Sequence, residues 1–60
     1  MNTADIKKGR TYRSTLVRVD GATIIATVTS VTETAVYYLN SGIEMGPCKP
    51  RDFADRHVPC

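Results

Sequence analysis

Residues 16–39 (LVRVDGATIIATVTSVTETAVYYL) constrain the fold most, because they hold most of the Val, Ile and Tyr residues of the chain. Side chains that branch at Cβ fit the pleated surface of a strand better than a helix, where they lose χ1 freedom. In this stretch Ile24, Ala26 and Val28 alternate with residues that are mostly threonines. This period of two predicts a β-strand whose Ile24, Ala26 and Val28 side chains face the core.

Turn signals divide the stretch into short strands. Asp20-Gly21 is a strong signal for a two-residue hairpin, because a type I′ turn requires positive φ at both central positions. Further turns are expected at residues 31–34, at residues 40–42 and at Gly46-Pro47. Strands that recur about every ten residues between such turns predict an antiparallel meander, which is typical of a small barrel or sandwich.

The last part of the chain predicts one or two helical turns within residues 48–57. Pro50 suits the first helical position. Phe53 shares a helix face with Ala54 and His57, and we expect Phe53 to plug one end of a barrel. Val58 and Pro59 are expected to end the helix, because the residue before a proline avoids the α region.

The length and composition limit the classes of protein to consider. With 60 residues there is room for one domain, residues 1–60. The net charge of +2 is too small to indicate a nucleic-acid partner by itself. No apolar run reaches the roughly 18 residues of a membrane span, and the N-terminus lacks the apolar core of a signal peptide. We therefore expect an intracellular protein without a membrane partner, with reduced cysteines.

The candidate binding residues are basic and aromatic. Lys7, Lys8, Arg10 and Arg13 fall within a short N-terminal segment, which is either a solvated entry to the first strand or a phosphate-contacting surface. Tyr12 is interpreted first as a core or rim aromatic and second as a stacking platform for bases.

Tyr37 and Tyr38 are neighbours in a predicted strand, so one should be buried and the other displayed. If Tyr37 faces inward with Ala35 and Leu39, then Tyr38 is the displayed tyrosine and a candidate binding residue. The opposite register is the alternative.

Cys48, His57 and Cys60 are the weak candidates for a metal site. A structural zinc ion takes four ligands with paired spacing, and these residues supply three, so we predict no metal and no cofactor. A Cys48–Cys60 disulfide is an alternative to two free thiols. Catalysis by a nucleophile requires a base and an orienting group, and His57 is the sole histidine. We therefore expect a protein that is not an enzyme.

Three segments carry a family resemblance: Gly9 to Tyr12, Val28 to Tyr38 and Cys48 to Ala54. Together they resemble small uncharacterised proteins encoded by bacteriophages and prophages. The resemblance implies an all-β fold, a small five-stranded antiparallel SH3-like or KOW-like barrel with a short C-terminal helical turn. It also implies the cytoplasm of a bacterial host cell. The chain departs from the family by ending soon after the helix, which leaves one barrel end less well covered.

Three functional hypotheses follow. The first is a non-enzymatic binding module that docks a host protein through an open strand edge or a displayed tyrosine. Such a module would inhibit a host defence system, for example in an anti-CRISPR role. The second is a nucleic-acid-binding module that uses the basic segment and either Tyr12 or Tyr38. The third is a structural or assembly protein that forms a homo-oligomer.

Overall fold

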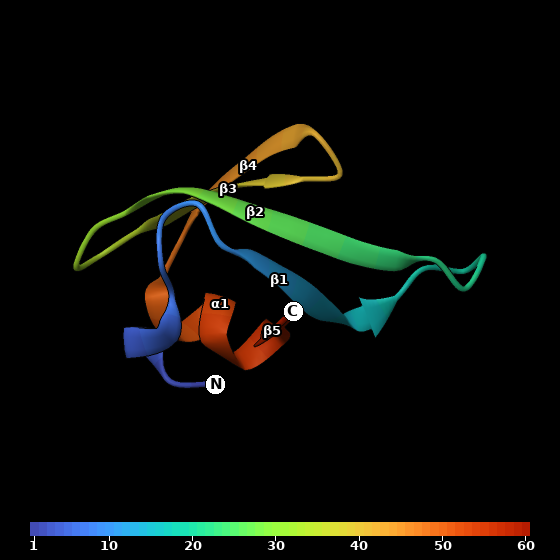
Figure 1. Ribbon diagram of the computed structural model, residues 1–60, viewed down its shortest axis with the longest axis horizontal. Coiled ribbons are helices and arrows are strands. Elements are labelled where there is room, and N and C mark those ends of the chain that lie inside the picture. The colour runs from blue at the N-terminus through green and yellow to red at the C-terminus, as the bar shows by residue number, and fades with distance from the viewer.

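The computed structural model covers residues 1–60, and the side chain of Val17 lies outside its described part. The chain forms one antiparallel sheet with a short α-helix and an N-terminal 3-10 turn. The elements in chain order are η1 (Thr3–Asp5), β1 (Thr11–Val17), β2 (Thr23–Val31), β3 (Val36–Asn40), β4 (Ile43–Cys48), α1 (Pro50–Arg56) and β5 (His57–Pro59). Figure 1 shows the sheet with both helices on the same side.

The strand order across the sheet is β4-β3-β2-β1-β5. The first four strands form a meander, and β5 returns after α1 to pair antiparallel with β1. The antiparallel sheet of five strands and the short C-terminal helix that the resemblance implies are observed, although the residue pattern itself did not indicate the fifth strand at His57–Pro59. Closure into a barrel is not observed, because β4 and β5 lie at opposite edges of the sheet instead of pairing.

The β1–β2 hairpin forms where Asp20-Gly21 predicts it, but the prediction of a type I′ turn is wrong. Of these two residues only Gly21 has positive φ, at 82°. The amide of Arg18 donates to the carbonyl of Ala22 at 3.2 Å, and the amide of Ala22 donates to Asp20 Oδ1 at 3.0 Å. The turn is therefore longer than two residues, and the Asp20 side chain replaces one backbone partner within it.

The other two hairpin turns follow from local chemistry. Between β2 and β3, the Thr32 hydroxyl accepts hydrogen bonds from the amides of Thr34 and Ala35 at 3.3 and 3.0 Å. Between β3 and β4, both Ser41 and Gly42 have positive φ, at 53° and 84°. A two-residue turn with positive φ at both positions matches the twist of the flanking strands.

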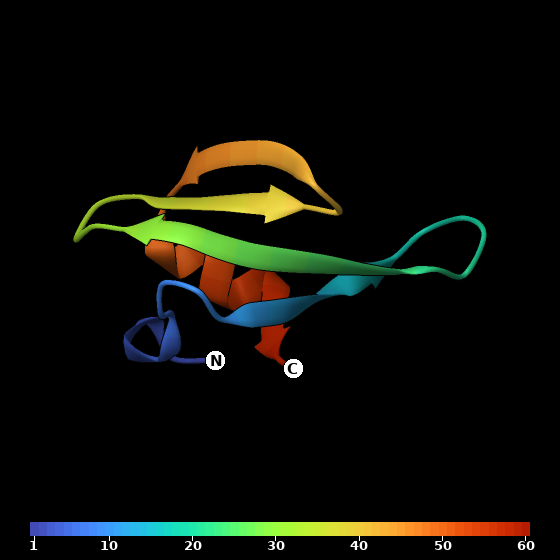
Figure 2. The ribbon, with the colours of Figure 1, turned by 45° about the horizontal axis from the view of Figure 1, so that its top comes forward.

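The core lies between one face of the sheet and α1. We name this face the inner face and the opposite one the outer face. In Figure 2, α1 lies behind β2 and β1, whereas β4 extends clear of it. The buried hydrophobic residues are Ile6, Tyr12, Ala26, Val28, Val36, Phe53 and Ala54. Burial of Ala26, Val28 and Phe53 confirms the predicted inward faces of β2 and the helix.

The helix ends earlier than predicted, at Arg56, because His57–Pro59 pairs with β1 as strand β5. Pro50 occupies the start of the helix as predicted. Neither η1 nor α1 has the length or apolar character that a membrane-crossing helix requires.

The fold exposes a large surface for its size. Its accessible area is 4208 Å², whereas a folded protein of 6.6 kDa exposes about 3,900 Å² on average. The exposed large hydrophobic residues are Leu16, Val19, Ile25, Tyr37, Ile43 and Met45. The single short helix therefore leaves part of the apolar sheet surface uncovered.

Candidate functional site

Phe53 of α1 is the centre of the covered half of the inner face. Its ring is 1% exposed and lies edge-on to Tyr12 and Tyr38, with centroid distances of 5.4 and 5.1 Å. The His57 ring stacks on it at 4.0 Å, with an angle of 10° between the planes. Such aromatic pairs add to the stabilisation that burial alone provides, so the helix is fixed at this point of the sheet.

The inner face continues beyond the helix onto β4. Met45 pairs with Tyr38, and Tyr38 pairs in turn with Val28 of β2. Directly paired residues of neighbouring strands point to the same face of a sheet, so all three side chains lie on the inner face. Exposure rises along this row, from 1% at Val28 to 39% at Met45.

The next row repeats the pattern. Ala26 pairs with Asn40, and Asn40 pairs with Ile43. Ala26 is fully buried, whereas Ile43 is 67% exposed. Tyr38, Ile43 and Met45 therefore form one apolar surface, which we name the inner shelf and which is continuous with the core.

Asn40 supplies a polar group beside the inner shelf. Its Oδ1 atom is buried and has no hydrogen-bond partner among the described residues. A buried acceptor without a partner destabilises the fold by about 1–3 kcal/mol.

Arg56 sets the charge on the helix side of the inner shelf. Burial raises the pKa of Tyr38, and the guanidinium of Arg56 opposes that shift. Burial, and then the Asp52 carboxylate, raise the pKa of Cys48. A thiol with a raised pKa is protonated at neutral pH and is a poor nucleophile.

His57 is buried and neutral at pH 7. Burial lowers its pKa, against the opposing effect of the hydrogen bond to Phe53. Nδ1 lies 3.0 Å from the carbonyl oxygen of Phe53, and because a carbonyl only accepts, Nδ1 carries the proton. The ring thus serves in the core packing around Phe53.

The predicted metal candidates are not brought together. His57 is in the core, Cys48 ends β4, and Cys60 is exposed after β5. Both thiols are free. Within the described part of the chain, no three His, Cys, Asp or Glu side chains form a group suited to a metal ion.

Neither tyrosine considered as a stacking platform is displayed, and the first interpretation of Tyr12, as a core aromatic, is confirmed. Tyr12 is fully buried, and its hydroxyl donates to the Asp5 carbonyl at 2.6 Å and accepts from the Lys7 amide at 2.7 Å. Tyr38 packs on Phe53 and so faces inward. The tyrosine displayed on the outer face is Tyr37, which is 40% exposed, so the second of the two registers is the observed one.

The predicted basic residues are all exposed. Lys7, Lys8 and Arg10 lie in the loop of residues 7–10 between η1 and β1, which we name the basic loop. Arg13 pairs with Ile25 and lies further along β1. The basic loop is bonded to β2 next to the start of β1, whereas the inner shelf lies on β3 and β4.

Both sheet edges resist the addition of another strand. The edge strand β4 carries the charge of Glu44 and has Gly46-Pro47 at a break in its register with β3. The other edge strand, β5, has three residues and ends at Pro59. Charges, prolines and short length are features that block edge-to-edge pairing. Docking by side chains is therefore favoured over docking by an open strand edge.

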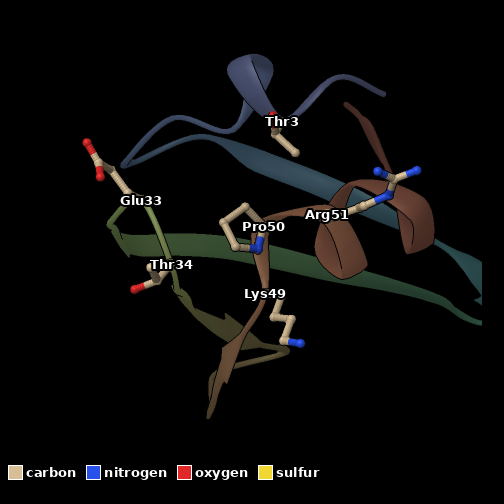
Figure 3. Close-up of a pocket in the computed structure, with 6 residues that line it drawn as sticks. All are labelled: Thr3, Glu33, Thr34, Lys49, Pro50 and Arg51. Atoms are coloured by element: carbon tan, nitrogen blue, oxygen red, sulfur yellow. The ribbon is translucent and has the colours of Figure 1, made fainter.

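A shallow hollow of about 390 Å³ lies where η1, the β2–β3 turn and the start of α1 meet. Figure 3 shows the ring of Pro50 at its centre, with the Glu33 and Lys49 side chains directed away from that ring. Its polar groups do not converge on one point, so this hollow has no feature of a specific ligand site.

Sequence reasoning missed Ile43 and Met45 as site residues. Their alternation with Glu44 indicates a shared face, but the sequence does not indicate how far α1 covers that face. Comparison of the chain with protein-family models, with curated proteins and with solved structures finds no match. The resemblance to phage proteins therefore rests on the quoted motifs.

Proposed function

We propose that the protein is a non-enzymatic binding module that docks a partner protein on the inner shelf. The observation that carries the proposal is the exposure of Ile43 and Met45, at 67% and 39%, on the sheet face that elsewhere forms the core. Apolar surface of this kind is stabilised when a partner removes it from water. The shelf is also positioned by paired strands, so docking requires little ordering.

The composition of the inner shelf and its border suits a protein interface. Aromatic residues, Met and Arg are enriched at such interfaces. Tyr38 and Met45 are paired here, and Arg56 is near enough to Tyr38 to affect its pKa. Asn40, which pairs with Ile43, places a polar residue beside this surface. An apolar centre with a polar border is the usual arrangement of a protein–protein contact.

The fold and the resemblance support a more specific form of this proposal. A four-strand meander followed by a short helix and a fifth strand that pairs with β1 supports an SH3-like fold that is open beside β4. The resemblance to phage proteins supports a host protein in the bacterial cytoplasm as the partner, and inhibition of host defence as the outcome of docking.

Matched variants test the proposal. Immobilised wild-type protein is compared with an Ile43→Ser/Met45→Ser double variant and with Leu16→Ser in capture from bacterial lysate, with quantitative mass spectrometry. Leu16 is also 67% exposed but lies on β1, so it is a control of equal exposure. We expect a captured protein to bind wild type and Leu16→Ser, and to bind the double variant about tenfold or more weakly, as for other interface anchors.

The opposite pattern would overturn the proposal. If capture survives in the double variant and is lost in Leu16→Ser, the partner docks elsewhere. Sedimentation of the purified protein distinguishes a structural or assembly protein from a module that binds a host protein. A self-associating chain would sediment as an oligomer, and the double variant would sediment as a monomer.

A further inference from the structure

The outer face of the sheet is open and displays one aromatic ring. Both helices lie on the inner side, and Tyr37 projects from β3 on the outer side with 40% exposure. The Thr29 hydroxyl donates to the backbone carbonyl of Tyr37 at 3.2 Å, which ties the backbone at this position to β2. An exposed ring on an ordered sheet is a suitable platform for a stacked base.

Strand β2 lies between the basic loop and Tyr37, because the loop continues β1 on one edge of β2 and Tyr37 belongs to β3 on the other. The amide of Gly9 donates to the carbonyl of Val28 at 2.8 Å, and the amide of Val28 donates to the carbonyl of Arg10 at 3.0 Å. The amide of Lys7 is held by the Tyr12 hydroxyl at 2.7 Å. The loop is thus anchored at several points while its three cationic side chains are exposed.

The register places the ring and the loop close together. Tyr37 pairs with Ser30 of β2, and the loop is bonded to Val28 of the same strand. Tyr37 and the loop are therefore separated by two strand spacings, about 10 Å. Figure 1 shows the loop rising from η1 to the level of β2.

We propose that Tyr37 and the basic loop together bind single-stranded nucleic acid, with Tyr37 stacking on one base and the basic loop, two strands away, contacting neighbouring phosphates. Charge complementarity supports this ligand, because Lys7, Lys8 and Arg10 supply three cations beside an exposed ring. Stacking on Tyr37 requires an unpaired base, which favours a single strand over a duplex. The surface is distinct from the inner shelf, so this inference is independent of the proposed protein partner.

Fluorescence anisotropy with labelled oligo(dT) and oligo(rU) of about 15 nucleotides tests the inference. For three phosphate contacts the affinity is expected to fall roughly 18-fold between about 50 and 200 mM salt. The variant Lys7→Ala/Lys8→Ala/Arg10→Ala should lose most of the affinity and most of the salt dependence. Tyr37→Ala should weaken binding about fivefold or more, with retention in Tyr37→Phe.

Two controls make the test specific. Lys49→Ala/Arg51→Ala/Arg56→Ala removes the same number of charges around α1 and should leave binding nearly unchanged. Glu33→Gln removes an acidic group from the β2–β3 turn, at the same end of the sheet as the loop, and should strengthen binding. The Ile43→Ser/Met45→Ser variant should bind as wild type.

Several results would overturn the inference. The first is no binding at the lower salt, and the second is an equal loss of affinity in the two triple variants. The others are an unchanged affinity in Tyr37→Ala and preferential binding of a duplex of the same length. Equal loss would identify a general effect of net charge.

Discussion

At the residue scale, two buried polar side chains hold the core together through backbone partners. Tyr12 connects the start of the chain to the sheet, because its hydroxyl bonds to both Asp5 and Lys7. His57 connects the end of α1 to β5 and stacks on Phe53. Both residues were candidates for function in the sequence, and both are structural here. A polar side chain in a short chain is difficult to assign from sequence because its partners are backbone atoms distant in the fold.

Replacing Tyr12 with Phe tests this structural role. The change keeps the ring in the core and removes the hydroxyl, which leaves the Asp5 carbonyl and the Lys7 amide without that partner. We expect the free energy of unfolding to fall by about 1–2 kcal/mol, measured by urea denaturation. Amide exchange should also accelerate in residues 2–6. An unchanged stability would show that water replaces the hydroxyl at no cost.

His57 predicts a pH dependence of stability. Its pKa is lowered in the folded protein from an ordinary value of 6.5, so the unfolded chain takes up the proton first as the pH falls. The stabilisation is therefore complete above about pH 6.5 and is lost below it, with a slope of at most about 1.4 kcal/mol per pH unit.

Urea denaturation at several pH values from about 7.5 to 5.5 measures this slope, and this range avoids most of the carboxyl titration. A His57→Phe variant is the control, because its stability should change less with pH. A wild-type protein that becomes more stable as the pH falls from 6.5 would contradict the sign.

At the element scale, the turns decide how the strands meet, and β4 is the most constrained strand. Gly46 has φ of 102°, and a Cβ atom added there would lie 2.9 Å from the carbonyl oxygen of Val36. This glycine lies where the register between β3 and β4 shifts. The irregularity allows Met45 and Cys48 to pair with inward-facing residues of β3, Tyr38 and Val36.

Gly46→Ala should therefore destabilise the protein more than Gly42→Ala. Both positions have positive φ, which costs a residue other than glycine about 1–2 kcal/mol. Gly42 has no atom within 4 Å of an added Cβ, whereas Gly46 also has the close carbonyl. Thermal and urea denaturation of the two variants measures the difference. Equal losses would mean that the β3–β4 pairing adapts to the added methyl group.

The elements were more predictable than their ends. The period of two in residues 24–28 and the Asp20-Gly21 signal were sufficient for β2 and the first hairpin, since both depend on local chemistry. The turn type at Asp20-Gly21 could not be predicted in this way, because the Asp20 carboxylate competes with the backbone for the Ala22 amide. Strand β5 was missed because its three residues form a strand only by pairing with β1, far away in sequence.

At the scale of the whole molecule, one short helix covers only part of a five-stranded sheet. The consequence is two open surfaces of different chemistry: the apolar inner shelf, and the exposed ring of Tyr37 with the nearby basic loop. The basic residues could be identified from the sequence by their type alone. The inner shelf could not be identified from the sequence, because the exposure of Ile43 and Met45 depends on the position of α1 relative to β4.

The central claim is that the inner shelf is open in the free protein. Solvent paramagnetic relaxation of methyl groups, measured by NMR with a soluble gadolinium chelate at several protein concentrations, tests it most directly. We predict strong relaxation for the methyl groups of Ile43 and Met45 and weak relaxation for those of Ile6 and Val36, which are 5% and 0% exposed. Protection of Ile43 and Met45 equal to that of Ile6 at every concentration would contradict the claim, because the sheet would then close over its own shelf.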